Sequence, residues 1–381
     1  MKAEAAMRLA LRAARTVEGL TYPNPPVGAV VFRGERVLGR GATRPVGGSH
    51  AEVVALEAAV RRFGEKSLRG AAMAVTLEPC CHVGRTGPCT GAIVDAGLRR
   101  VYVGHTDPHP GVAGRGVRDL RRAGVEVAVG VLENECRNQH RGFLTVCDRG
   151  RPFVMLKLAS SLDGRIALAG GESRWITGPQ ARAIGHRLRA RSDAILIGSM
   201  TAVADDPEFV ARRGNRVIAR PIRVLVDSRL RVPASAKLYA EGADRTWVLC
   251  GKSAAASRRN ALERTDARVL TIAMRDGHIA LKPALALLAR EGLTQILVEG
   301  GGELAAALLR SKLVDELHWF VAPRILGGDG RASMGALGLA RLVRSPEVEA
   351  RVGRAGRDVY IRGHVRYPDR KPASAQGRTE P

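Results

Sequence analysis

The chain of 381 residues is long enough for two domains of ordinary size. Hydrophobic residues make up 45% of it and aromatic residues 4%, so each domain can bury a core of Ala, Val and Leu, and the lack of an apolar run of about 18 residues predicts no transmembrane helix. The formal net charge of +24 points to anionic partners. Because the basic residues are scattered and only eight are Lys, it favours phosphate-bearing small ligands over nucleic acid.

The first part of the chain alternates between helical and strand patterns. The expected elements, in order, are a helix over 1–20, an extended turn at 23–26, a strand over 27–32, a helix over 50–63, a strand over 73–77, a helix over 90–96, a strand over 101–104, a helix over 117–123 and a strand over 125–129. This alternation predicts a layered α/β domain over residues 1–148. Charge, Gly and Pro at 148–152 mark a domain boundary.

A second alternation of the same kind follows and predicts another α/β domain over residues 152–366. Its expected strands are 153–158, 194–197, 222–227, 246–249, 296–299 and 317–322. The polar segment 367–381 is expected to be a disordered tail.

The cysteines indicate a reducing compartment. Six Cys in a chain of this length do not form a disulfide framework, and three of them lie within 80–89, which favours metal chemistry. Residues 1–15 carry charges throughout, so no secretory signal is expected. We therefore expect a cytoplasmic protein.

Three stretches of the first domain together predict a catalytic zinc site. His50 and Glu52 open a helix, Cys80 follows a strand, and Cys89 begins the next helix. One imidazole and two thiolates leave a fourth zinc position for water, whose pKa zinc lowers to about 7. Glu52 can reach that water without being a ligand and can carry its proton to a leaving amine. The ordered set is the signature of zinc nucleobase deaminases.

Each part of this signature is weak by itself. A His-Ala-Glu sequence usually marks an ordinary helix start, and buried cysteines after a strand are usually core residues. The prediction rests on the order of the whole set. Cys81 and His82 are spare candidate ligands, and we expect neither to bind, because three ligands and a water complete a catalytic site.

The loop over residues 76–89, Thr-Leu-Glu-Pro-Cys-Cys-His-Val-Gly-Arg-Thr-Gly-Pro-Cys, resembles that of the bifunctional riboflavin-biosynthesis deaminase–reductases. Eight residues separate its first and last cysteines, whereas most nucleotide and tRNA deaminases have two. The sequence Pro-Asn-Pro-Pro-Val-Gly at 23–28 is also similar, which implies that Asn24 lies in the pyrimidine pocket. Further similar motifs follow in order at 157–165, 171–177, 205–207, 227–228, 299–301 and 322–328, so the resemblance covers residues 1 to about 364.

The chain departs from the family pattern at several positions. Tyr22 and Thr43 stand where the family has His, Ser49 where it has Pro, and Cys81 where it has Ser. The sequence Phe-Val-Ala-Arg at 209–212 replaces Leu-Thr-x-Arg. These changes leave the zinc signature intact but concern the substrate pocket. Alternatives are therefore a paralogue acting on a related aminopyrimidine, a nucleic-acid deaminase favoured by the charge, and a binding protein without turnover.

The resemblance implies an N-terminal cytidine-deaminase-like three-layer domain followed by a dihydrofolate-reductase-like α/β domain. It implies zinc-dependent hydrolytic deamination of 2,5-diamino-6-(5-phosphoribosylamino)pyrimidin-4(3H)-one. NADPH reduction of the ribosyl group would then give 5-amino-6-(5-phosphoribitylamino)uracil, an intermediate of riboflavin biosynthesis. The partner is a phosphorylated small-molecule substrate, with no membrane and no nucleic acid, and related reductase domains suggest a homo-oligomer.

The resemblance also implies contacts in the second domain. The implied NADPH contacts are Ala159, Trp175, Thr201, Asp205, Ser228, Gly301, Gly302, Glu303 and Leu304. The implied substrate contacts are Ser173, Arg189, Phe209, Arg212 and Glu299.

Some of these contacts have a physical reason of their own. Glycines at 300–302 follow a strand and open a helix, an arrangement that suits phosphate, although glycine runs often form only turns. Arg189 and Arg212 could clamp a phosphate, or could be solvated surface charges in an Arg-rich chain. Lys157 and Asp163 could form a structural ion pair or polarise the sugar carbonyl.

Overall fold

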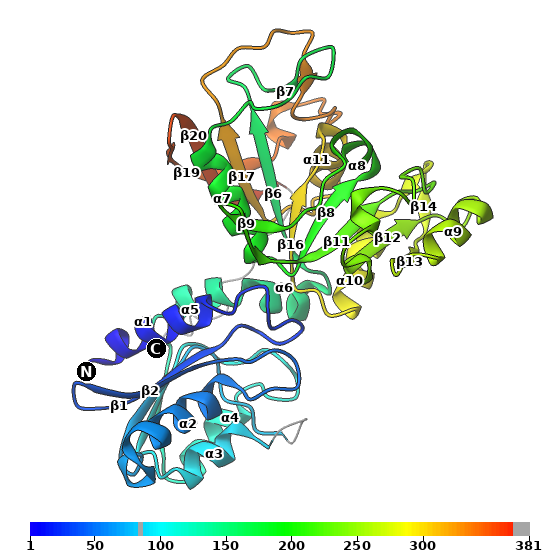
Figure 1. Cartoon of the computed structure of the whole chain (residues 1–381). Helices are drawn as coiled ribbons and strands as arrows, with labels where there is room; N and C mark the ends of the chain where they lie inside the picture. The colour runs from blue at the N-terminus through cyan, green and yellow to red at the C-terminus, as the bar shows by residue number, and fades with distance from the viewer. Residues whose placement is uncertain (83–86, 369–381) are drawn as a thin grey trace. The chain divides into compact units, whose positions relative to one another are not determined.

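The computed structural model describes residues 1–82 and 87–368 (Figure 1). The chain divides into two compact units. The first contains Met1–Pro152 and Leu288–Gln295, and the second contains Phe153–Leu287 and the chain from Ile296 onward. Among the described helices, none is long and apolar enough to cross a membrane.

The described residues of the first unit form a five-stranded sheet and six helices. Its helices are α1 (Ala3–Arg15), α2 (Ala51–Phe63), α3 (Cys89–Asp95), α4 (Arg115–Arg122), α5 (Glu133–Gln139) and α6 (Arg141–Arg149), and Glu65–Ser67 forms a 3-10 turn. Its strands are β1 (Gly28–Arg33), β2 (Arg36–Ala42), β3 (Ala72–Val75), β4 (Arg100–Val103) and β5 (Glu126–Val129). The sheet order is β2-β1-β3-β4-β5, with β1 antiparallel to β2 and β3, and with β3, β4 and β5 parallel.

Helices cover both faces of this sheet, which gives the three layers that the sequence predicts. Successive residues of β1 point to opposite faces. Val30 and Phe32 pack with Met7 and other apolar residues of α1, while Ala29 and Val31 pack in a separate core with α2, α3 and α4. Since both faces are buried at the centre of the sheet, β1 and β3 consist mainly of apolar residues.

Strand β2 is absent from the predicted elements because two glycines interrupt its apolar pattern. A Cβ atom at Gly39 would lie 2.1 Å from the carbonyl oxygen of Ala55, and one at Gly41 would lie 2.2 Å from that of Ala51. Helix α2 therefore lies directly on the backbone of β2. This close packing sets the position of the first turn of α2, which carries the predicted zinc ligand and proton carrier.

The second unit is built on a nine-stranded sheet of order β13-β12-β11-β8-β16-β6-β17-β20-β19. These strands are β6 (Phe153–Ser160), β8 (Ala194–Gly198), β11 (Ile222–Val226), β12 (Thr246–Cys250), β13 (Arg268–Thr271), β16 (Gln295–Glu299), β17 (Glu316–Val321), β19 (Glu347–Ala355) and β20 (Asp358–Arg366). Short two-stranded pairs lie outside the sheet: β7 (Arg165–Ala167) with β18 (Arg331–Ala332), β9 (Ala211–Arg213) with β10 (Arg216–Ala219), and β14 (Met274–Arg275) with β15 (His278–Ile279).

Five helices and three 3-10 turns complete the unit. The helices are α7 (Pro179–Ala190), α8 (Ser199–Asp205), α9 (Ala256–Glu263), α10 (Leu281–Arg290) and α11 (Gly302–Arg310), and the turns are Lys237–Tyr239, Ala243–Arg245 and Leu342–Arg344. Strands β13, β12, β11, β8 and β16 run parallel to one another, and β6 runs parallel to β17, while β20 is antiparallel to both β17 and β19. All six strands expected from the sequence lie in this sheet.

The folded chain extends further than the sequence predicts. The tail is expected to begin at residue 367, but the Tyr367 side chain is buried, and its hydroxyl donates to the Val314 carbonyl oxygen at 3.1 Å and accepts from the Val314 N–H at 3.2 Å. These bonds join Tyr367 to the segment just before β17. The rest of the predicted tail from residue 369 lies outside the described residues.

Candidate zinc and reductase sites

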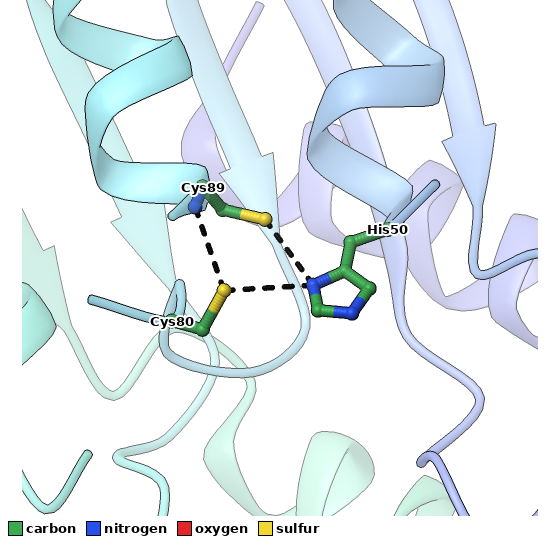
Figure 2. Close-up of side chains that lie close together, drawn as sticks. All are labelled: His50, Cys80 and Cys89. Carbon is green, nitrogen blue, oxygen red and sulfur yellow. Dashed lines mark hydrogen bonds between the residues drawn. The ribbon is translucent and has the colours of Figure 1, made fainter. Parts of the chain in front are cut away.

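His50, Cys80 and Cys89 form a compact cluster in the first unit (Figure 2). The Nδ1 atom of His50 lies 3.5 Å from Sγ of Cys80 and 3.3 Å from Sγ of Cys89. His50 immediately precedes α2, Cys89 is the first residue of α3, and Cys80 lies in the loop after β3. The three elements thus bring ligands from distant parts of the sequence to one point.

The cluster fits a tetrahedral zinc ion. Ligand bonds of about 2.0 Å to nitrogen and 2.3 Å to sulfur imply N···S separations of roughly 3.5 Å. The two observed His50–Cys distances agree with this geometry. These three residues are the potential metal group found among the described residues, and it includes neither Cys81 nor His82.

Cys80 is prepared for metal binding by hydrogen bonds. The Cys89 backbone N–H donates to Sγ of Cys80 at 3.4 Å. Hydrogen bonding from the Cys89 thiol, and then from His50, lowers the pKa of Cys80 to about 4. Since a thiolate is the form that binds zinc, Cys80 is in the ligand state before any metal arrives, whereas its hydrogen bond to Cys80 raises the pKa of Cys89, whose proton must leave when zinc binds.

Glu52 is buried beside this cluster on the first turn of α2, with 4% of its surface exposed. Burial, followed by the nearby Cys80 charge, raises the pKa of Glu52 to about 7 in the metal-free site. A carboxyl group with a pKa near neutrality can both accept and donate a proton at physiological pH. The structure therefore places a proton carrier next to the candidate metal position.

A second buried carboxylate, Glu78, was not assigned a role from the sequence although it lies within the recognised loop motif. One oxygen accepts the backbone N–H groups of Asp107 and Gly114, and the other accepts that of Val117, each at 3.0 Å. These bonds hold the segment before α4 against the loop that carries Cys80. Its position between a strand and the Pro-Cys pair is the sequence signal that could have identified it.

A chain of hydrogen bonds also connects buried residues far apart in the sequence. The Thr76 hydroxyl accepts the Gly28 N–H at 3.1 Å and lies 3.2 Å from His140 Nε2, while His140 Nδ1 lies 2.9 Å from His105 Nε2. His105 Nδ1 lies 2.8 Å from the Thr106 carbonyl oxygen, which can only accept. The chain is consistent when both imidazoles are neutral and each donates through Nδ1.

This histidine pair predicts acid sensitivity of the first unit. Burial lowers the pKa of His105 to about 4 and that of His140 well below the ordinary value of 6.5. A depressed histidine pKa means that stability is present above pH 6.5 and is lost as the pH falls toward the folded-state value. At about 1.4 kcal/mol per pKa unit, His105 alone should account for roughly 3 kcal/mol lost between pH 6.5 and 4.

This loss is measured by unfolding the protein in urea at several pH values and monitoring the first unit by hydrogen exchange. His140→Gln removes one titrating ring, so its stability should fall less steeply with pH than that of the unmodified protein, while being lower at pH 7. Protonation of the zinc ligands contributes equally to the pH dependence of stability in both proteins, so it does not affect the difference between them. Equal pH slopes would show that His140 is not responsible.

The departures from the family pattern near this site have structural partners. The Thr43 hydroxyl accepts the Val27 N–H at 3.1 Å, and its own N–H donates to the Val27 carbonyl at 3.0 Å, so Thr43 ties the end of β2 to the start of β1. The Ser49 carbonyl accepts the Arg44 N–H at 3.1 Å and closes the loop before His50. The Asn24 backbone closes a turn with Thr21, and its substrate contact stays a prediction.

In the second unit, two of the predicted substrate residues bind each other. Arg189 on α7 donates to both carboxylate oxygens of Glu299 at the end of β16, at 2.6 and 2.8 Å. Lys157 on β6 lies 3.8 Å from the same carboxylate. Although burial alone would raise the pKa of Glu299, Arg189 and then Lys157 hold it at about 2. Two cations and one carboxylate leave one excess positive charge, which suits an anionic ligand.

The bonds to Glu299 show that Arg189 fits neither of the two roles considered for it from the sequence. It is neither a solvated surface charge nor a free clamp, because three of its N–H groups are used by Glu299 and by the Val210 carbonyl. Its guanidinium carbon lies 5.3 Å from the centre of the Phe209 ring, so that residue is beside the cluster. Lys157 belongs to the same charged group, which favours a place in the site over a remote ion pair.

Arg212 and Ser173 are less closely tied to this cluster. The Arg212 guanidinium pairs with Glu208 at 2.6 Å and donates to the Asn215 carbonyl at 3.2 Å. Only its backbone N–H reaches α7, where it donates to His186. Ser173 is partly buried in the segment before α7, and its substrate contact stays a prediction.

Asp163 has a structural role that the sequence left open. Its carboxylate accepts the Ser161 hydroxyl at 2.5 Å and the backbone N–H groups of Leu326 and Gly327, the shortest at 2.8 Å. The Ser161 hydrogen bond lowers the pKa of Asp163 to about 2. Asp163 therefore joins two of the recognised motifs, and it forms no ion pair with Lys157 among the described residues.

Several predicted cofactor residues gather at the carboxyl ends of neighbouring parallel strands. Thr201 follows β8, Ser228 follows β11, and Gly301 follows β16. The Gly301 N–H donates to the Thr201 hydroxyl at 3.1 Å. Ligands of open α/β sheets bind at this edge, so the residues fit a phosphorylated cofactor.

The remaining predicted cofactor residues lie on several different elements of the second unit. Gly302 begins α11, where a Cβ atom would lie 2.8 Å from the Ala332 carbonyl, so only glycine fits. Glu303 and Leu304 continue the first turn of that helix, and Ala159 lies in β6. Arg174 donates to the Asp205 carbonyl at 3.3 Å, which joins the segment of Trp175 to the end of α8.

Trp175 also lies in the wall of an open cavity of about 560 Å³. Its exposed ring stacks under the Arg182 guanidinium at 4.5 Å, and Arg324 and Arg357 complete a basic lining. An exposed aromatic ring among arginines suits a phosphorylated ring compound.

Comparisons with known proteins identify the two parts of the chain. The family described as "Cytidine and deoxycytidylate deaminase zinc-binding region" matches residues 1–105, and the "RibD C-terminal domain" matches residues 152–353. The riboflavin biosynthesis protein RibD of Escherichia coli is 38% identical over 374 residues, covering 95% of this chain and 99% of its own length. RibD of Aquifex aeolicus is 38% identical over 356 residues, covering 93% and 96%.

Solved structures show the same relationship. RibD of Acinetobacter baumannii has a TM-score of 0.84 at 35% identity, covering 96% of this chain and 99% of that one. A diaminohydroxyphosphoribosylaminopyrimidine deaminase/5-amino-6-(5-phosphoribosylamino)uracil reductase of Thermotoga maritima has a TM-score of 0.81 at 31% identity, covering 96% and 98%. The predicted fold class, a deaminase domain followed by a reductase domain, is confirmed, and the chain belongs to the RibD family of bifunctional riboflavin-biosynthesis enzymes that use zinc and NADPH.

Proposed function

We propose that the first unit deaminates 2,5-diamino-6-(5-phosphoribosylamino)pyrimidin-4(3H)-one and that the second unit reduces the ribosyl group of the product. The observation that carries this proposal is the presence of two separate sites in one chain. One is the His50, Cys80 and Cys89 cluster with buried Glu52, and the other is the Arg189–Glu299 pair near the turn that opens α11.

In the first site, the chain's own groups perform the proton transfers. Zinc held by the three ligands supplies a nucleophile at neutral pH, because it lowers the pKa of water to about 7. Glu52 would take one proton from that water and deliver it to a ring nitrogen, and would then take the proton of the hydroxyl group added to the ring carbon and deliver it to the departing amine. Asn24 orients the pyrimidine ring.

In the second site, the chain binds and orients a phosphorylated sugar. NADPH supplies the hydride that reaches C1 of the sugar. Thr201, Ser228 and the Gly301–Leu304 turn hold the cofactor phosphates at the carboxyl ends of the strands. The excess positive charge beside Glu299 attracts the anionic substrate, and Lys157 is the cation available to polarise the sugar carbonyl. Ser173, Phe209 and Arg212 complete the substrate pocket.

Separate assays of the two half-reactions test the proposal. Ammonia release from the diaminopyrimidinone should require zinc but not NADPH, and NADPH oxidation should require the deaminated product but not zinc. Metal-stripped protein should therefore lose the first reaction and keep the second on pre-deaminated substrate. Intact zinc-loaded protein that releases no ammonia from this compound would contradict the substrate assignment, and the positions Tyr22, Thr43 and Phe209 would then suggest a related aminopyrimidine.

We also propose a cytoplasmic homo-oligomer. Thiol ligands at Cys80 and Cys89 need a reducing compartment. Strand β19 is an edge of the nine-stranded sheet, and Val352 on it is exposed, as a surface that pairs with a second copy would be. Light scattering measures the subunit number, and a monomer at micromolar concentration would contradict the second part.

A further inference from the structure

His186 connects the charged cluster of the second unit to the β9–β10 hairpin. It lies on α7, one turn before Arg189, and its Nδ1 atom accepts the backbone N–H of Arg212 at 3.2 Å. The hairpin belongs to a separate two-stranded sheet, so no ladder hydrogen bonds tie it to the nine-stranded sheet. The His186 bond is thus a direct polar link from β9 to the helix that carries Arg189.

The segment held by this link carries two predicted substrate residues. Phe209 lies two residues before β9 and contacts Arg189, and its backbone φ of +49° lies in a region that a bulky residue rarely adopts. Arg212 lies within β9 itself. A backbone held in an uncommon conformation needs fixed neighbours on both sides, and His186 is one of them.

The hydrogen bond requires a neutral imidazole. An acceptor at Nδ1 must keep its lone pair, so the proton lies on Nε2. The charged groups facing the ring are Arg189 on its own helix, Arg212 on β9 and Glu299 at the end of β16. Two cations outweigh the carboxylate, which is already paired with Arg189. Burial first, and then Arg189, lower the pKa of His186 below 6.5.

We propose that His186 is a positioning residue of the reductase: its neutral ring, together with the Arg189 bond to the Val210 carbonyl, holds Phe209 and Arg212 against the Arg189–Glu299 pair, and its protonation removes one of these links and loosens the segment. The neutral ring binds the Arg212 N–H at neutral pH, and the protonated ring cannot accept it. Substrate binding therefore weakens as the pH falls below 6.5, while the hydride-transfer step changes less. The substrate class in this inference rests on the proposed function.

Two substitutions distinguish the effect of the hydrogen bond between His186 and the Arg212 N–H from the effect of protonating the His186 ring. His186→Asn places an amide oxygen where Nδ1 is and cannot titrate, whereas His186→Gln places its amide at the Nε2 position and loses the acceptor. NADPH oxidation with 5-amino-6-(5-phosphoribosylamino)uracil, measured from pH 5 to 8, gives KM and kcat for each protein. Loss of one hydrogen bond of about 1 kcal/mol corresponds to a change of roughly fivefold in KM.

The unmodified protein should show a KM that rises by that factor below pH 6.5. His186→Asn should keep the neutral-pH KM without this rise, and His186→Gln should have the raised KM at every pH. The substrate phosphate also titrates near pH 6, but it affects all proteins alike. His278→Asn, at an exposed histidine of the same unit, should behave as the unmodified protein. The inference is overturned if His186→Asn keeps the rise or if His186→Gln leaves KM unchanged.

A measurement without substrate makes the test independent of the proposed function. Hydrogen exchange of residues 209–213, corrected for the intrinsic pH dependence, should lose protection below pH 6.5 in the unmodified protein and not in His186→Asn. Equal protection in both proteins down to the lowest pH at which both stay folded contradicts the positioning role even if the substrate is a different compound. Failure of turnover with intact exchange behaviour would instead contradict only the substrate assignment.

Discussion

Replacing Glu52 with Gln is expected to lower the rate of ammonia release by about 10² to 10⁴-fold, the range typical of a lost general acid–base group. Gln has nearly the same size as Glu but cannot carry a proton. Because Glu52 is not a ligand of the cluster, bound zinc should remain near one ion per chain. Ammonia assays together with metal analysis by mass spectrometry measure both quantities.

A matched control lies on the same helix. Glu57→Gln removes an exposed carboxylate that pairs with Arg44 at 3.4 Å, and it should leave ammonia release unchanged. Cys89→Ser, in contrast, should lose both zinc and ammonia release, because the oxygen ligand replaces a buried thiolate. If Glu52→Gln retained more than a tenth of the ammonia release, another group would have to carry the proton.

The second large effect is expected at Glu299. Substituting it with Gln leaves the Arg189 guanidinium buried without its negative partner, and breaking such a pair costs about 3–5 kcal/mol. NADPH oxidation should be lost, while ammonia release by the first unit continues. All three Trp residues, Trp175, Trp247 and Trp319, lie in the second unit, so tryptophan fluorescence in urea reports its unfolding free energy.

An exposed ion pair of the same unit provides the comparison. Glu241 pairs with Arg220 at 2.7 Å, and its side chain is 80% exposed. Glu241→Gln should change the unfolding free energy by less than about 1 kcal/mol, since solvent screens exposed pairs. A similarly small change for Glu299→Gln would show that Arg189 finds another partner and that the cluster is not a tightly coupled group.

The sequence by itself determined the zinc site. His50, Glu52, Cys80 and Cys89 occur in the order of the zinc nucleobase deaminase signature, and that match identified them without a structure. The buried strands were also predicted, because continuous apolar runs between turn residues have few other structures available. Strand β2 was missed since Gly39 and Gly41 remove the apolar pattern, although close packing against α2 requires them.

Only the tertiary structure decided which distant polar groups share a bond. Arg189 and Glu299 are 110 residues apart, His105 and His140 are 35 apart, and Tyr367 reaches back to Val314. Periodicity describes which face of an element is buried, but it carries no information about which polar side chain lies opposite. Buried polar groups must find partners wherever the packed elements place them. For that reason the roles of Glu78, Asp163 and His186 follow from the fold and not from the order of residues.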